Sequence, residues 1–153
     1  VALPPVPDAG GEGWFDLYIG NASDKQPRIL LVSIALAPDG SVRYVLNNRS
    51  AKGYDNVSAE GFLCSNTSLS FNEAKRSAYK PFGYADMVNR RWISARNSEW
   101  KPIDSILNTT DPTRIVLYRA FCADGRPDSN AALQQRVRER SGRYAKSLGN
   151  PGK

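Results

Sequence analysis

Histidine is absent from this chain of 153 residues, and cysteine occurs only at Cys64 and Cys122. Without an imidazole, the chain cannot assemble a Ser-His-Asp triad or a Cys-His pair. Two thiols alone cannot supply the four ligands of a structural zinc site. The sequence therefore excludes the commonest nucleophilic hydrolases, and we expect neither a metal ion nor another cofactor.

Long hydrophobic runs are also missing. The longest, residues 29–32, ends at Ser33, whereas roughly 20 apolar residues are needed to span a bilayer. We therefore expect no transmembrane segment. The proline-rich start, residues 1–7, is too short for a secretory signal peptide, so an exported protein is expected to be present here in its mature form.

Acidic side chains are scarce near the C-terminus. Residues 126–153 carry seven Lys or Arg against two Asp or Glu, whereas the rest of the chain carries fourteen against thirteen. The net charge of +6 is thus concentrated in this segment. Any anionic partner is expected to meet the protein there.

The two cysteines lie 58 positions apart, and each ends a run of residues typical of a β-strand. We interpret them as one disulfide, which indicates an oxidising compartment such as the periplasm, the cell surface or the medium. The alternative is a pair of buried free thiols in a cytosolic protein.

Strand patterns dominate residues 28–122. Residues 28–36 and 42–47 flank a Pro-Asp-Gly turn and predict a hairpin. Alternation over residues 57–64 places Glu60 on the same face as Phe62. Further short strands are expected at residues 69–71, 78–82, 91–95 and 114–122.

A helical period replaces the strand pattern after residue 127. Asp128, Ser129 or Asn130 can cap the helix, and one apolar face is formed by Leu133, Val137, Tyr144 and Leu148. The expected fold is therefore α+β or mainly β: a twisted antiparallel sheet of about six to eight strands with one C-terminal helix and one disulfide. Residues 1–27 are expected to form an extended Pro/Gly-rich segment, and residues 28–148 a single domain.

Glu60 is the acidic residue of most interest, because a mid-strand carboxylate can be partly buried and paired with an arginine such as Arg43. Such a group could act as the general acid or base of a small hydrolase or transferase. The alternatives are a structural ion pair and a solvated residue on the outer face.

Two other groups of side chains allow a functional interpretation. Trp92 and Trp100 could form the base of a ligand-binding groove, or they could pack in the hydrophobic core. Arg136, Arg140 and Arg143 lie along one side of the predicted helix and could bind phosphate groups, or they could form a solvated face. No recognised nucleic-acid motif accompanies this charge, so nucleic acid is a disfavoured partner.

Three blocks resemble the family named after a cryptic neisserial protein: DGSVRY (39–44), NVSAEGFLC (56–64) and FCADG (121–125). The resemblance extends over about residues 28–140 and implies a small exported protein of β-proteobacteria whose members are described as uncharacterised. Ala59 replaces the usual aromatic residue, and residues 65–88 form a longer stretch than expected. The family motif includes Arg43, Tyr44, Glu60, Cys64 and Cys122, to which the resemblance assigns no role.

These observations favour a non-enzymatic protein of the periplasm or cell envelope, secreted or lipid-anchored, that binds a component or supports an assembly. Its partner is expected to be an anionic envelope component or another envelope protein. The alternatives are a small periplasmic hydrolase or transferase that uses Glu60, and a binder of anionic components through the basic C-terminal helix.

Overall fold

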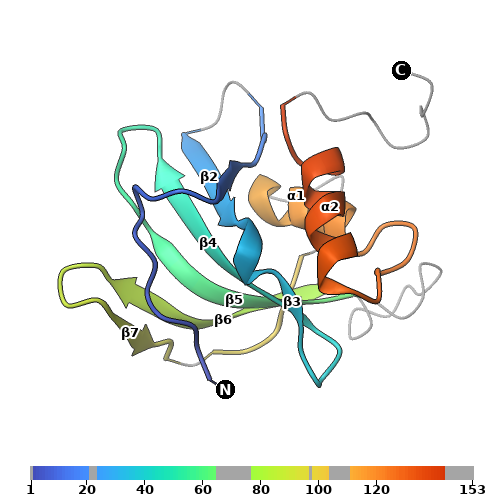
Figure 1. The fold of residues 1–153 in the computed structure, drawn as a ribbon, viewed down its shortest axis with the longest axis horizontal. Helices are drawn as coiled ribbons and strands as arrows, with labels where there is room; N and C mark the ends of the chain where they lie inside the picture. Colours follow the sequence, from blue (N-terminus) through green and yellow to red (C-terminus); the bar gives the residue numbers. More distant parts are fainter. Residues whose placement is uncertain (1, 21–23, 65–76, 97, 104–110, 144–153) are drawn as a thin grey trace.

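The computed structural model describes residues 2–20, 24–64, 77–96, 98–103 and 111–143. These residues form an antiparallel sheet of eight strands and two α-helices, with strand order β1-β2-β4-β5-β6-β7 (Figure 1). Outside this order, β3 pairs with β4 and β8 with β6. The strands are β1 Trp14–Asp16, β2 Lys25–Leu30, β3 Ala35–Leu36, β4 Val42–Ser50, β5 Val57–Leu63, β6 Ala78–Asp86, β7 Arg91–Ser94 and β8 Lys101–Pro102, and the helices are α1 Pro112–Phe121 and α2 Asn130–Arg140. The predicted sheet with a C-terminal helix is confirmed.

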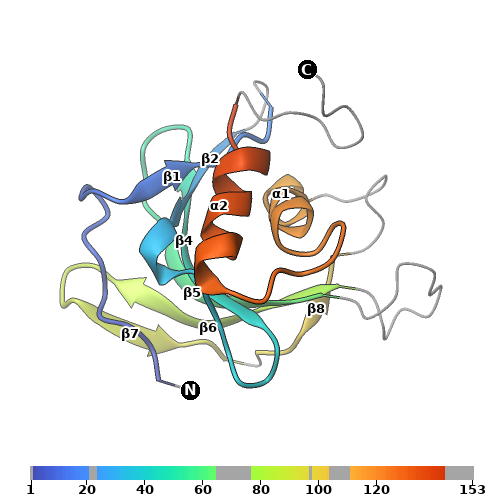
Figure 2. The same ribbon diagram turned by 45° about the vertical axis from the view of Figure 1, so that its right-hand side comes forward.

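Both helices pack on one face of the sheet (Figures 1 and 2). The core between these layers is apolar, and burial of its surface, at about 25 cal/mol per Å², is the main force that holds the helices there. Its fully buried side chains include Ile29, Val42, Leu46 and Phe62 from the sheet, Leu117 and Phe121 from α1, and Leu133 and Val137 from α2.

The N-terminal segment crosses the opposite face of the sheet, seen in dark blue in Figure 2. A second, smaller core forms there around Ala9, Val45 and Val57. The Trp92 indole fixes the segment by donating to the Pro4 carbonyl at 2.5 Å. The sheet itself begins at β1, within residues 1–27, so part of this Pro/Gly-rich segment belongs to the sheet.

The prediction of a strand at residues 114–122 is wrong, because these residues form most of α1. Asp111 caps the helix by accepting from the Arg114 backbone N–H at 3.2 Å, and Pro112 occupies the first turn, where its missing N–H costs nothing. The helix packs against both the sheet and α2. Between Arg114 and Arg119 its sequence is therefore an unbroken run of large hydrophobic residues, Ile115 to Tyr118, as in a buried strand.

The predicted hairpin is confirmed at its turn, but residues 28–36 are not one strand. β2 ends at Leu30, and a 3₁₀ turn at Leu31–Ser33 (η1) precedes β3. The Ser33 hydroxyl donates to the Leu30 carbonyl at 2.6 Å and accepts from the Val45 backbone N–H at 2.8 Å. This side chain thereby replaces the backbone pairing that a continuous strand would make.

The remaining elements agree with the sequence where the structure describes them. α2 begins after Ser129, whose hydroxyl accepts from the Ala132 backbone N–H at 3.1 Å. The predicted strands at 78–82 and 91–95 lie in β6 and β7. α2 ends at Arg140, with Ser141 as its C-cap, so it is shorter than predicted and Arg143 lies beyond it. The expected strand at 69–71, and the positions Tyr144 and Leu148 of the predicted helix, lie outside the described residues.

Candidate functional site

Glu60 lies in the middle of the sheet, on the face that the helices cover. It is 2% exposed and stands opposite Tyr44 in the register of β4 and β5. The pairing of β5 with β6 shifts by one residue between Ala59 and Glu60. Such bulges re-aim side chains and are common next to functional sites.

Among the described residues, three side chains donate hydrogen bonds to the Glu60 carboxylate. The Tyr44 hydroxyl donates to Oε1 at 3.1 Å, and the Ser58 hydroxyl donates to Oε2 at 2.7 Å. Arg114 Nη2 donates to the same Oε2 at 2.5 Å. Both carboxylate oxygens are therefore used as hydrogen-bond acceptors. We call these four residues the Glu60 clamp, since they fasten α1 to the sheet.

Arg114 also contacts a second carboxylate and an aromatic ring. Its Nη1 lies 3.5 Å from Asp111 Oδ2, and its guanidinium carbon lies 4.3 Å from the centre of the Tyr79 ring. Burial disfavours the charge of Arg114, but the neighbouring Glu60 carboxylate raises its pKa above the ordinary value. Burial, reinforced by the Glu60 charge, raises the pKa of Tyr44 well above the ordinary value, so the phenol remains a donor.

Arg43 is not the partner of Glu60, contrary to the prediction. It precedes Tyr44 in β4, and its side chain therefore points to the other face of the sheet. There its Nη2 lies 3.0 Å from Asp39 Oδ2. The true partner, Arg114, comes from a helix 54 residues further along the chain, a contact that no local pattern reveals.

The candidate tryptophans make packing contacts on the face away from the helices. Trp100 meets Phe82 edge-on, with 6.4 Å between ring centres, and the guanidinium of Arg43 lies 4.2 Å from the centre of the Phe82 ring. Trp92 holds the N-terminal segment and packs against the smaller core. Neither tryptophan is among the residues that line the two cavities beside Glu60.

Glu60 lines a cavity on each side of the sheet. The smaller, of about 60 Å³, brings together Arg43, Tyr44 and Glu60 with the N-terminal residues 2–4. The larger, of about 130 Å³, is polar and adds residues that sequence reasoning missed, since α1, β6 and β8 meet there only in the folded protein. Its lining consists of Asn48, Asn56, Ser58, Glu60, Tyr79, Pro81, Tyr84, Lys101 and Arg114.

The predicted disulfide between Cys64 and Cys122 is confirmed. The sulfur atoms are 2.06 Å apart and the Cα atoms 5.3 Å apart. Cys64 follows β5 and Cys122 caps the C-terminal end of α1. The disulfide and the Glu60 clamp therefore fix opposite ends of the same helix to the same strand.

Two of the three candidate anion-binding arginines contact the C-terminal end of α1. Arg136 donates to the carbonyls of Ala123 and Gly125, the latter at 2.7 Å. Arg140 donates to the carbonyls of Arg119 and Ala123 at 3.2 and 3.1 Å. Arg119 belongs to the last turn of α1, whose carbonyls carry partial negative charge, and Ala123 and Gly125 lie in the turn that follows. Both guanidinium groups therefore have a structural role at the end of α1.

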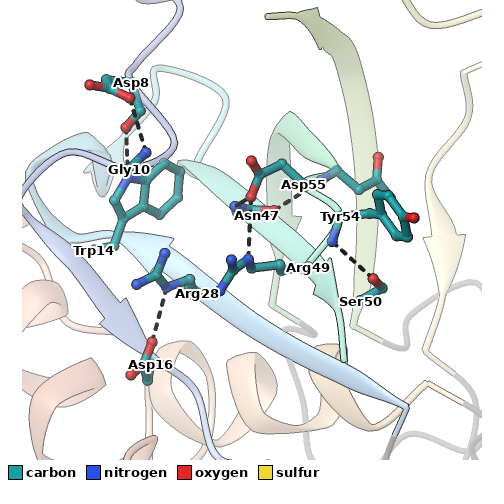
Figure 3. A network of polar contacts seen from close by, with 11 residues as sticks. Asp8, Gly10, Trp14, Asp16, Arg28, Asn47, Arg49, Ser50, Tyr54 and Asp55 are labelled. Atoms are coloured by element: carbon teal, nitrogen blue, oxygen red, sulfur yellow. Dashed lines mark hydrogen bonds and ion pairs between the residues drawn. The ribbon is translucent and has the colours of Figure 1, made fainter. Parts of the chain in front are cut away.

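Arg143, the third candidate, lies elsewhere, on an open cavity of about 500 Å³. Its guanidinium carbon lies 5.2 Å from the centre of the Tyr18 ring. Lys25 and Arg28 from β2, and Arg49 from β4, line the same cavity. Figure 3 shows Arg28 and Arg49 together with their carboxylate partners. We call the space lined by Lys25, Arg28, Arg49 and Arg143 the basic cavity.

Within the described ranges, no helix is long and apolar enough to cross a membrane. In the same part of the chain, no three His, Cys, Asp or Glu side chains gather in a way that could hold a metal ion.

Comparison with known proteins places this chain beside a named family. The family model described as CNP1-like matches residues 1–138. The chain is 55% identical to Cryptic neisserial protein 1 of Neisseria gonorrhoeae (strain ATCC 700825 / FA 1090) over 148 residues, which cover 95% of this chain and 73% of that protein. No solved structure matches.

Proposed function

The chain belongs to the CNP1-like family, and from this premise we propose that it is an exported envelope protein that acts as a non-enzymatic binding module. The observation that carries the proposal is the Glu60 clamp. The carboxylate that the sequence offered as a general acid or base accepts three hydrogen bonds and neutralises a buried arginine. In that position it joins a helix to the sheet, which is a structural task.

Export is supported by the disulfide between Cys64 and Cys122. Such bonds form and persist in the periplasm, at the cell surface and in the medium, whereas cytosolic thiols are kept reduced. A binding role is supported by the basic cavity, which is large enough for a small ligand.

A second candidate function is a hydrolase or transferase that uses Glu60. It is favoured by one observation: Glu60 lines a polar pocket, and a second carboxylate, Asp111, shares Arg114 with it. Paired carboxylates can divide the roles of acid and base. The Glu60 carboxylate, however, is occupied by Arg114 and by two hydroxyl donors, and a general acid or base needs its oxygens within reach of the substrate.

One experiment tests location. The protein is recovered from fractionated cells of its native host after free thiols have been blocked, and its peptides are analysed without reduction. We expect the periplasmic or envelope fraction to contain the peptide pair joined through Cys64 and Cys122. Recovery in the cytosol with both thiols alkylated would overturn the export proposal.

A second experiment tests the absence of catalysis. Purified wild-type protein and the Glu60→Gln variant are each incubated with an envelope fraction of the host, and released products are measured by mass spectrometry. We expect identical product profiles. A product released by the wild type, and lost in a Glu60→Gln protein that circular dichroism shows to be folded, would establish the enzyme alternative instead.

A further inference from the structure

The basic cavity carries an excess of positive charge. Among the residues that the structure describes, four basic side chains line it against one acidic side chain, Asp16. The basic residues come from three places in the chain: β2, β4 and the segment that follows α2. Folding thus gathers charges that the sequence keeps far apart, which indicates a site rather than a stretch of basic sequence.

Arg28 and Arg49 are close neighbours on one face of the sheet. Arg28 stands opposite Asn47 in β4, and Arg49 lies two residues beyond Asn47, so the two arginines are diagonal neighbours. Like charges at this spacing repel each other unless an anion lies between or beside them. Figure 3 shows both side chains on the same side of β2 and β4.

Each arginine has a carboxylate partner at its inner nitrogen. Arg28 Nε lies 3.1 Å from Asp16 Oδ1, and Arg49 Nε lies 3.5 Å from Asp55 Oδ1. The side chain of Asp16 is 83% exposed and that of Asp55 is 39% exposed, so water screens both contacts. These partners orient the two guanidinium groups but leave the charge of the cavity positive.

A third side of the cavity is built by Arg143 and Tyr18. The Tyr18 backbone N–H donates to the Ser141 carbonyl at 2.8 Å, which fixes the segment after β1 to the end of α2. This contact brings Tyr18 under the Arg143 guanidinium. Arg143 therefore approaches the cavity from an element outside the sheet.

We propose that the basic cavity binds a ligand that carries phosphoryl groups, with Arg28, Arg49 and Arg143 as its contacts. This inference rests on the proposed binding function and names its ligand class. Guanidinium groups form paired hydrogen bonds with phosphate oxygens. Several arginines around one space suit an anion with two or more negative charges, and a volume of about 500 Å³ admits one larger than a single phosphate.

The test uses the purified, disulfide-bonded protein and two probes. Inorganic pyrophosphate represents a free phosphoryl ligand, and vesicles of phosphatidylglycerol in phosphatidylcholine represent a lipid headgroup. Binding is measured at low salt by calorimetry and by co-sedimentation. The variant Arg28→Gln/Arg49→Gln removes two cavity charges, and Arg91→Gln/Arg138→Gln removes two exposed charges outside the cavity lining, which makes it the matched control.

We expect the wild type to bind at least one probe, the cavity variant to bind it about tenfold or more weakly, and the control to stay within about twofold of the wild type. Binding of pyrophosphate identifies a free phosphoryl ligand as the source. Binding of vesicles alone, with the same dependence on the variants, identifies a lipid headgroup. Binding of neither probe, or an equal loss in the control variant, would overturn the proposal.

The same samples separate this inference from the proposed function. Absence of binding removes the phosphoryl site but leaves an exported, non-enzymatic protein. Release of inorganic phosphate from pyrophosphate by the wild type but not by Glu60→Gln removes the non-enzymatic function but leaves the binding site.

Discussion

Arg114, in the first turn of α1, donates to Glu60, in the central strand β5, at 2.5 Å, and both side chains are almost fully buried. This contact fixes the first turn of α1 against the sheet. Burial of an isolated charge is very costly in free energy. Each of these two charges therefore offsets the cost of burying the other. The pair therefore specifies one position of α1.

The first prediction concerns the loss of one partner of this pair. Glu60→Gln leaves Arg114 buried without its main counter-ion, and we expect the free energy of unfolding to fall by about 3 kcal/mol or more. Urea unfolding of the disulfide-bonded protein measures it. The control Asp16→Asn breaks a solvated ion pair with Arg28 and should cost less than about 1 kcal/mol.

The same pair predicts non-additivity. Arg114→Met alone leaves the Glu60 carboxylate buried and uncompensated, whereas Glu60→Gln/Arg114→Met removes both charges. The double variant should therefore be more stable than the sum of the two single losses predicts. Strict additivity would show that the two side chains do not act together, in contradiction to the clamp.

The second prediction concerns alkaline pH. Burial and the Glu60 charge raise the pKa of Tyr44 in the folded protein above its unfolded value of about 10. The folded state then binds more protons than the unfolded state, so this contribution is complete below about pH 10 and is lost as pH rises further. Wild-type protein should lose more unfolding free energy between about pH 9 and about pH 11 than Tyr44→Phe does. An equal loss in both proteins would mean that Tyr44 ionises as it does in the unfolded chain.

The sheet could be predicted from the sequence because its signals are local. The turn at Gly40, which has a φ of 86°, and the alternation through β5 depend on neighbouring residues only. The disulfide was predictable because two cysteines leave one pairing. The helix α1 is missed because the apolar run Ile115 to Tyr118 is equally typical of a buried strand, and the decisive signal is the cap formed by Asp111 and Pro112.

The site was harder to predict than the fold. The position of Glu60 in the middle of a strand pattern allows partial burial and pairing with an arginine such as Arg43, but it does not say which arginine lies on the same face. Strand alternation sends Arg43 to the other face, and the helix supplies Arg114. The basic cavity combines residues from positions 25 to 143, so only the folded chain shows it.

The third prediction concerns the disulfide. In the chain-entropy model, a loop of 58 residues contributes about 4 kcal/mol to the free energy of unfolding. Adding a thiol reductant should lower the urea midpoint of the wild type accordingly. Cys64→Ser/Cys122→Ser should begin at the lower midpoint and show no response to reductant. A response in that variant would point to an effect of the reductant itself.

The fourth prediction concerns Gly61, which allows close packing on the outer face. A Cβ at this position would lie 3.0 Å from Phe82, 3.2 Å from Trp100 and 3.3 Å from Arg43. Gly61→Ala should therefore cost about 1–3 kcal/mol and shift the tryptophan fluorescence of the folded protein. Gly10→Ala is the matched control, since its nearest atom lies at 3.7 Å and the glycine is exposed. Equal stability of the two variants would show that the outer cluster adjusts freely.

The fifth prediction separates two roles of the arginines on α2. Arg136 and Arg140 donate to carbonyls at the end of α1, so Arg136→Gln/Arg140→Gln should lower the free energy of unfolding by about 1–2 kcal/mol. Arg138→Gln removes an exposed charge from the same helix and should change stability by less than about 0.5 kcal/mol.

The same variants are compared for their retention on an anionic matrix. We expect a small fall in retention that is the same for each positive charge removed, whichever of the three arginines carried it. If the double variant instead keeps its stability and loses retention steeply, these two arginines act as an anion site and the contacts to α1 are incidental. That outcome would move the binding surface from the basic cavity to the helix. We expect the opposite, because guanidinium groups that donate to carbonyl oxygens have fewer donors left for an external anion.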